Sequence, residues 1–130
     1  TLTENYVPAW WQSAFQKISG LLDLPANWDS YGALQVDRDL AYYAVSILQD
    51  VAHPDIPEPA IVPTTSGGIQ FEWHSNNIDP EFEVVSPTSI IASFEDSETG
   101  TAWEDELSFD LEPISDVVRT LVNRRRLQAA

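Results

Sequence analysis

Carboxylates are the main side chains of this sequence that could do chemistry, and they are concentrated in its middle. The chain has 21 Asp and Glu residues against six Lys and Arg residues, a formal net charge of −15. Residues 54–112 contain fourteen of the acids and no base, whereas residues 113–130 contain one acid and four arginines. Clustered carboxylates attract basic protein surfaces and repel phosphate backbones and anionic lipid. The charge distribution therefore favours a basic protein surface as partner, and it disfavours direct nucleic acid or membrane binding.

Carboxylates can also coordinate divalent cations or catalyse glycoside hydrolysis. The sequence has no calcium loop of alternating acids with a central glycine and a terminal glutamate, so we expect no metal site. A carboxylate-pair hydrolase stays open as an alternative, although any pair among 21 acids is uninformative by itself. Such an enzyme would need a concave site, whereas we expect the acids to form an open surface.

Other residues suited to catalysis are scarce. The chain has no cysteine and only two histidines, His53 beside several prolines and His74 in an alternating apolar and polar segment. It contains no GxSxG, GxGxxG or GxxxxGK[ST] motif. We therefore expect no catalytic residue, no cofactor and no enzymatic activity.

The cysteine count and the apolar pattern also bear on location. A chain without cysteine forms no disulfide and suits a reducing compartment, so we expect a cytoplasmic protein. No apolar run reaches about 18 residues. The first residues, TLTENYVPAWW, lack the basic start and apolar centre of a signal peptide. The sequence leaves open the oligomeric state and the order of the strands in any sheet.

A second candidate site is the segment NWDSYGA, which combines aromatic planes with short polar side chains. Asn27, Trp28, Asp29 and Tyr31 are suited to holding a small ligand or a peptide. In the alternative interpretation the loop folds on itself, with Asp29 bonding backbone amides, Gly32 supplying a positive φ, and the two aromatic rings covering the core edge. The sequence favours this structural interpretation and leaves the ligand-binding loop as an alternative.

Three helices are expected. The first is predicted over residues 8–22, with Pro8 in its first turn. Its apolar stripe consists of Trp11, Phe15, Ile18 and Leu22. Asp37 is expected to cap a second helix that ends near Ala52. Pro113 opens the last helix, in which Ile114, Val117, Val118 and Leu121 share one face. The arginines at 124–126 are expected to oppose the negative end of the helix dipole, with a nucleic-acid patch as the alternative.

Residues 60–112 change to an apolar and polar period of two, which predicts about five antiparallel strands joined as a meander. The strands are predicted at residues 60–63, 69–74, 81–86, 89–95 and 103–111, separated by turn-forming residues. We expect residues 1–130 to form a single α+β domain with two-layer packing. Residues 1–53 form its helical part, 60–112 an acidic β-meander, and 113–130 a C-terminal helix with a basic tail.

Strand parity divides the predicted sheet into an apolar face and an acidic face. The apolar face, expected to point toward the helices, consists of Ile69, Phe71, Trp73, Phe82, Val84, Ile90, Ala92, Phe94, Trp103, Leu107 and Phe109. The opposite face consists of Glu72, Glu81, Glu83, Glu95, Glu104, Glu106 and Asp110. Because like charges on neighbouring strands destabilise a sheet, this face is either functional or only solubilising. We expect it to bind the basic partner.

The segments LPANWDSYGA, GGIQFEWH and EFEV together resemble a group of small, acidic, mostly uncharacterised bacterial proteins. That group shares a Leu-Pro-x-Asn-Trp-Asp-x-Tyr-Gly-Ala element, a Gly-Gly-Ile-x-x-Glu-Trp hairpin and a following acidic strand. The resemblance spans about Leu21 to Thr101, and NNIDPEF replaces a shorter, glycine-containing turn. It implies a bacterial or phage origin and a stand-alone domain, with no established activity or cofactor. Proteins of this type often act as antitoxins, immunity proteins or nuclease inhibitors, so we expect an inhibitory binding module.

Overall fold

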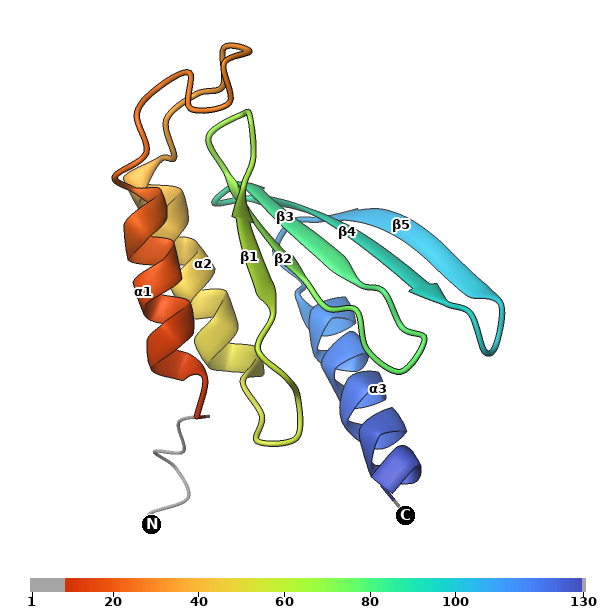
Figure 1. Ribbon diagram of the computed structural model, residues 1–130. Helices are drawn as coiled ribbons and strands as arrows, with labels where there is room; N and C mark the ends of the chain where they lie inside the picture. Colours follow the sequence, from red (N-terminus) through yellow and green to blue (C-terminus); the bar gives the residue numbers. More distant parts are fainter. Residues whose placement is uncertain (1–8, 130) are drawn as a thin grey trace.

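The computed structural model describes residues 9–129, which contain three helices and a five-stranded antiparallel sheet (Figure 1). The helices are α1 (Trp11–Leu21), α2 (Arg38–Val51) and α3 (Glu112–Ala129). The strands are β1 (Ala60–Pro63), β2 (Ile69–Glu72), β3 (Glu81–Ser86), β4 (Ser89–Asp96) and β5 (Thr101–Leu107). Their spatial order follows the sequence, so the predicted α+β meander is confirmed.

The core lies between the helices and one face of the sheet. Figure 1 shows α1 and α2 beside β1, and α3 beneath the later strands. Alternate strand residues such as Phe71, Phe82 and Ile90 are buried, and they join buried side chains of all three helices in one cluster. This burial explains the apolar and polar alternation of residues 60–112, since every second side chain of a strand points into this core. The opposite sheet face is left to solvent.

The apolar stripe of α1 differs from the prediction. Ala14 and Ile18 are the buried residues of this helix, whereas Phe15 is 50% exposed. α2 also buries alanines, Ala41 and Ala44, and small side chains let two helices approach closely. The large aromatic ring of Phe15 therefore stays outside the close contact between α1 and α2. The predicted Pro8 lies outside the described residues.

The cap predicted for α2 is confirmed, and so is the apolar face of α3. The Asp37 carboxylate accepts hydrogen bonds from the backbone N–H groups of Asp39 and Leu40, at 2.8 and 3.2 Å. This satisfies two of the amides that the first turn of a helix leaves without partners. On α3 the apolar residues Ile114, Val117, Val118 and Leu121 lie on one face and are all buried, as the sequence indicates by their spacing. No helix in the range 9–129 combines the length and apolar character needed to cross a bilayer.

Candidate functional site on the acidic sheet face

The sheet register places the glutamates side by side on the face that the helices leave open. Glu72 on β2 lies directly opposite Glu81 on β3. Glu81 in turn faces Ser93 on β4, and Ser93 faces Glu104 on β5. Directly opposed residues on antiparallel strands have Cβ atoms only about 5 Å apart. This row therefore concentrates three carboxylates across four strands.

A second row runs parallel to the first. Glu83 on β3 faces Ile91 on β4, which faces Glu106 on β5. Ile91 is 39% exposed, an apolar side chain between two acids. Glu95 lies further along the same face of β4, opposite Ala102. Six of the seven predicted face residues therefore do lie on one side of the sheet, which we call the acidic face: Glu72, Glu81, Glu83, Glu95, Glu104 and Glu106.

Two residues predicted on the fifth strand, Asp110 and Phe109, depart from the prediction. β5 ends at Leu107, so Asp110 lies beyond the sheet, where its carboxylate accepts a hydrogen bond from the Glu112 N–H at the start of α3. Phe109, predicted to face the helices, is 86% exposed. Trp103 does lie on the helix side, where it stacks on Phe94, but it is only partly buried. The predicted strand was too long because its alternation continues into the loop before α3.

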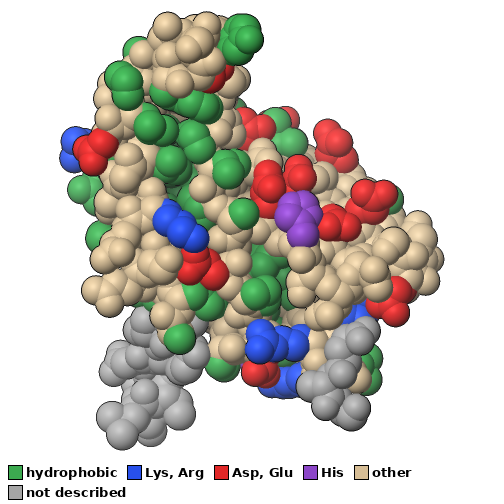
Figure 2. Space-filling view, viewed as in Figure 1, with side chains coloured by type: hydrophobic (Ala, Val, Ile, Leu, Met, Phe, Trp, Pro, Cys, Tyr) green, Lys and Arg blue, Asp and Glu red, His purple; other side chains and the backbone are tan. Residues whose placement is uncertain are grey.

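Basic side chains do not neutralise the acidic face. Among residues 9–129 the Lys and Arg ion pairs are Lys17 with Glu58, Arg119 with Glu112 and Asp116, Arg124 with Asp96 and Glu98, and Arg126 with Asp55. None of these carboxylates belongs to the face. Figure 2 shows acidic side chains gathered over the strand layer around a histidine, with Lys and Arg side chains mainly over the helices and the lower edge. The described lysines and arginines therefore leave the acidic face unpaired, whereas His74 bonds one of its carboxylates, that of Glu72.

Part of this surface is hollowed. A shallow depression of about 500 Å³ is lined by Asp79, Glu81, Ser93, Glu95 and Glu104, together with Phe94, Ala102 and Trp103. The Asp79 N–H donates to the Glu95 carbonyl at 2.8 Å, which fixes the loop after β2 against β4. The face is therefore less flat than predicted, with carboxylates on several sides of one depression.

His74 adds a titratable group to one end of this surface. Its Nδ1 lies 2.7 Å from Asp79 Oδ1, and its Nε2 lies 3.2 Å from Glu72 Oε2. The hydrogen bond to Asp79 and then that to Glu72 raise the pKa of the imidazole above its usual value of 6.5. One ligand atom each of Glu72, His74 and Glu81 also lies within 4.8 Å of the others. Sequence reasoning placed His74 on the strand exterior but missed this cluster, which the Glu-x-His spacing could have suggested.

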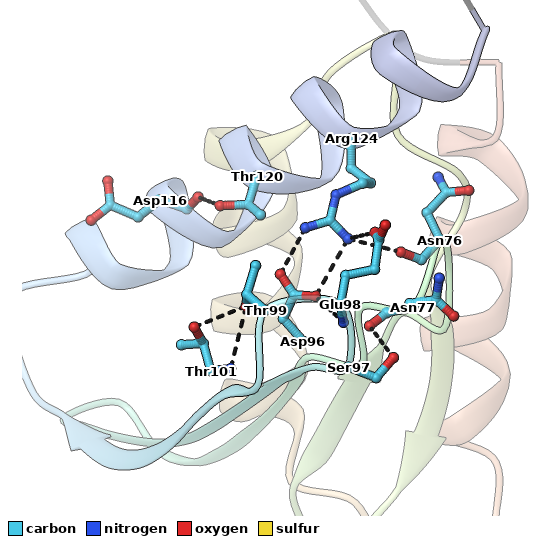
Figure 3. A network of polar contacts seen from close by, with 10 residues as sticks. All are labelled: Asn76, Asn77, Asp96, Ser97, Glu98, Thr99, Thr101, Asp116, Thr120 and Arg124. Carbon is cyan, nitrogen blue, oxygen red and sulfur yellow. Dashed lines mark hydrogen bonds and ion pairs between the residues drawn. The ribbon is translucent and has the colours of Figure 1, made fainter.

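Arg124 has a structural role that the helix-dipole interpretation did not predict (Figure 3). Its Nη2 lies 2.7 Å from Oδ2 of Asp96, a carboxylate that is only 4% exposed, and its Nη1 donates to the Asn76 carbonyl at 3.1 Å. Glu98 pairs with the same guanidinium. The hydrogen bond from Arg124 lowers the pKa of Asp96 to about 2. This arginine therefore fastens α3 to the end of the sheet and leaves the acidic face free.

The NWDSYGA loop is held by its own polar groups. Asn27 Oδ1 accepts from the Gly32 N–H at 2.7 Å, and Asp29 Oδ1 accepts from the Tyr31 and Ala33 N–H groups at 2.9 and 3.0 Å. Trp28 Nε1 donates to the Leu34 carbonyl at 3.3 Å. Tyr31 is 92% exposed, so it does not cover the core edge as the structural interpretation expected. Three of the four candidate ligand residues are thus engaged in shaping the loop.

The segment that follows the NWDSYGA loop contacts the glycine turn between β1 and β2. Leu34 N–H donates to the Thr65 carbonyl and Asp37 N–H to the Gly67 carbonyl, both at 2.9 Å. A Cβ at Gly68 would lie 2.3 Å from the Val84 carbonyl oxygen, closer than any side chain tolerates. The two glycines, Gly67 and Gly68, therefore let β3 and the segment after the loop approach this turn closely.

The geometry leaves the acidic face as the strongest candidate site, because its carboxylates pair with no lysine or arginine of residues 9–129, whereas the polar groups of the loop bond the loop itself. Comparison of the chain with protein-family models, with curated proteins and with solved structures gave no match.

Proposed function

We propose that this protein is a non-enzymatic binding module whose acidic face docks on the basic surface of a nucleic-acid-handling protein and blocks it, as an inhibitor, antitoxin or immunity protein does. The observation that carries the proposal is the row Glu72, Glu81, Glu104 with the flanking Glu83, Glu95 and Glu106, none of which pairs with a described lysine or arginine. Such a face costs the sheet stability, which a partner's cations would offset.

The spacing of the charges suits a surface that normally binds phosphates. Side chains on one face recur about every 6.6 Å along a strand and about 4.8 Å between strands. The six glutamates thus occupy positions on a grid of these spacings, which Ile91 and Ser93 interrupt, and their charge steers association with a basic partner. A protein that holds nucleic acid presents several cations at comparable density.

The exposed side chain of Ile91, between two glutamates, offers an apolar contact to a protein partner, which a phosphate backbone could not offer. Protein interfaces combine a desolvated centre with a polar rim. Ile91, 39% exposed between Glu83 and Glu106, is suited to be such a centre. The lack of cysteine suits the cytoplasm, where we place the interaction.

A matched pair of charge reversals tests the proposal. Glu81→Lys with Glu104→Lys changes two acidic-face residues; Asp23→Lys with Asp50→Lys changes two exposed acids elsewhere, and both double variants alter the net charge equally. The wild type is used to capture proteins from extracts of its native host, and each captured protein is challenged with duplex DNA. We expect a nucleic-acid-binding protein that DNA displaces, that the Asp23/Asp50 variant retains and that the Glu81/Glu104 variant loses.

Either of two results would contradict the proposal. Equal loss in both double variants would mean that net charge alone drives capture. Retention by the Glu81/Glu104 variant would mean that the partner binds another surface. Circular dichroism of each variant checks that the sheet is intact.

A further inference from the structure

Glu72, His74 and Glu81 converge at one end of the acidic face for a reason that the strand geometry explains. Glu72 ends β2, His74 follows two residues later, and Glu81 begins β3 directly opposite Glu72. One ligand atom from each side chain lies within 4.8 Å of the other two. Ligands about 2.1 Å from one metal ion lie at most about 4.2 Å apart, so small side-chain rotations suffice to close the set.

The imidazole is oriented by a neighbouring carboxylate. His74 Nδ1 is bonded to Asp79 Oδ1 at 2.7 Å, which leaves Nε2 on the side of Glu72. This is the arrangement that fixes ligand histidines in metal sites, where the nitrogen that does not bind the ion donates to a carboxylate. Gln70 Nε2 donates to Glu72 Oε1 at 2.6 Å and so holds the other oxygen of that ligand.

We propose that Glu72, His74 and Glu81 bind a divalent first-row transition ion of the Zn²⁺ class, with Asp79 as a positioning residue. One imidazole nitrogen and two carboxylate oxygens form a mixed ligand set that suits such ions, whereas Ca²⁺ takes six to eight oxygens. No thiolate of the chain competes with these ligands for the ion, because the sequence has no cysteine.

The site leaves room for a further ligand. The His74 side chain is 52% exposed, and Asp79 and Glu81 also line the depression of the acidic face. Three protein ligands leave the fourth position of a tetrahedral ion open to water or to a group bound in that depression. A metal ion at this site could therefore coordinate a group of a partner that binds in the depression.

Calorimetric titration of the full chain with ZnCl₂ tests the assignment. About 0.15 M NaCl and excess Mg²⁺ suppress diffuse attraction of cations to the acidic surface. We expect one Zn²⁺ per chain, and affinity at least about tenfold weaker in His74→Ala and in Glu81→Gln. Asp79→Asn should weaken binding by about 10- to 100-fold, as loss of an orienting partner does.

The second histidine of the chain provides the matched control. His53 lies in the connector after α2, and His53→Ala should leave Zn²⁺ affinity unchanged. Glu81→Gln removes a ligand without a core change, so it keeps the test valid if His74→Ala folds poorly. Zn²⁺ binding that survives both His74→Ala and Glu81→Gln, or that Mg²⁺ abolishes in the wild type, would overturn the assignment and show adventitious binding only.

Discussion

Replacing Glu81 by glutamine should stabilise the protein, because Glu81 lies directly opposite Glu72 and has no described basic partner. A directly opposed pair of like charges costs a sheet about 0.2–1 kcal/mol, so its relief should add about 0.5 kcal/mol to the free energy of unfolding. Glutamine keeps the size and the hydrogen-bonding ability of the side chain, so packing changes little. The predicted gain is the signature of a surface that is not optimised for stability.

Urea unfolding at low salt measures this gain. With a denaturant slope of about 1.5 kcal/mol per M, 0.5 kcal/mol raises the urea midpoint by about 0.3 M. The gain should shrink at 1 M NaCl, where the Debye length of about 3 Å is shorter than the separation of the pair. Asp23→Asn is the matched control, since it removes one exposed charge outside the sheet and should move the midpoint little.

Two results would refute this reasoning. Equal stabilisation by Glu81→Gln and Asp23→Asn would mean that the repulsion is global and that the face costs nothing special. Destabilisation by Glu81→Gln at both salt concentrations would mean that the carboxylate makes a stabilising contact in the folded chain.

Three further predictions concern the scaffold. Arginine pairing lowers the pKa of Asp96 from 3.8 to about 2, so the stabilisation by this ion pair is present above about pH 4 and is lost as the pH falls toward 2. Asp96→Asn should therefore lower the free energy of unfolding at pH 7 and flatten its decrease between about pH 4 and 2, as measured by urea unfolding at each pH. Gly68→Ala should cost at least about 2 kcal/mol in thermal unfolding, because its Cβ would overlap the Val84 carbonyl, and a smaller loss would contradict that crowding. Asp29→Ala should cost about 1–2 kcal/mol by freeing two amides, whereas Tyr31→Ala should stay within about 0.5 kcal/mol; the reverse order would disprove the self-supported loop.

Local patterns were sufficient to predict the fold. Alternating side chains and turn residues predict a strand wherever one face is buried, and the Asp37 cap marks the start of α2 by its own hydrogen bonds. The order of the strands in the sheet was left open by the sequence, and the structure shows that consecutive strands are neighbours. The same alternation predicted most of the acidic face, since parity decides which side each glutamate occupies.

Contacts between distant segments could not be predicted in the same way. The burial of Asp96 depends on Arg124, 28 residues later, so the end of β4 was not recognised as part of an ion pair. The predicted buried face of α1 was wrong at Phe15, because a close contact between two helices favours small side chains such as Ala14 over large apolar ones. The cluster around His74 needed the register of β2 and β3, which places Glu81 across from Glu72.

The association rate with the captured partner at several salt concentrations tests the central claim most directly. If the acidic face steers docking, the wild-type rate should fall at least about tenfold between 20 and 500 mM NaCl. At low salt the Glu81→Lys/Glu104→Lys variant should associate at least about tenfold more slowly than the Asp23→Lys/Asp50→Lys variant, although both carry the same net charge. Equal rates for the two variants, or a wild-type rate that salt does not change, would contradict a docking role for this face.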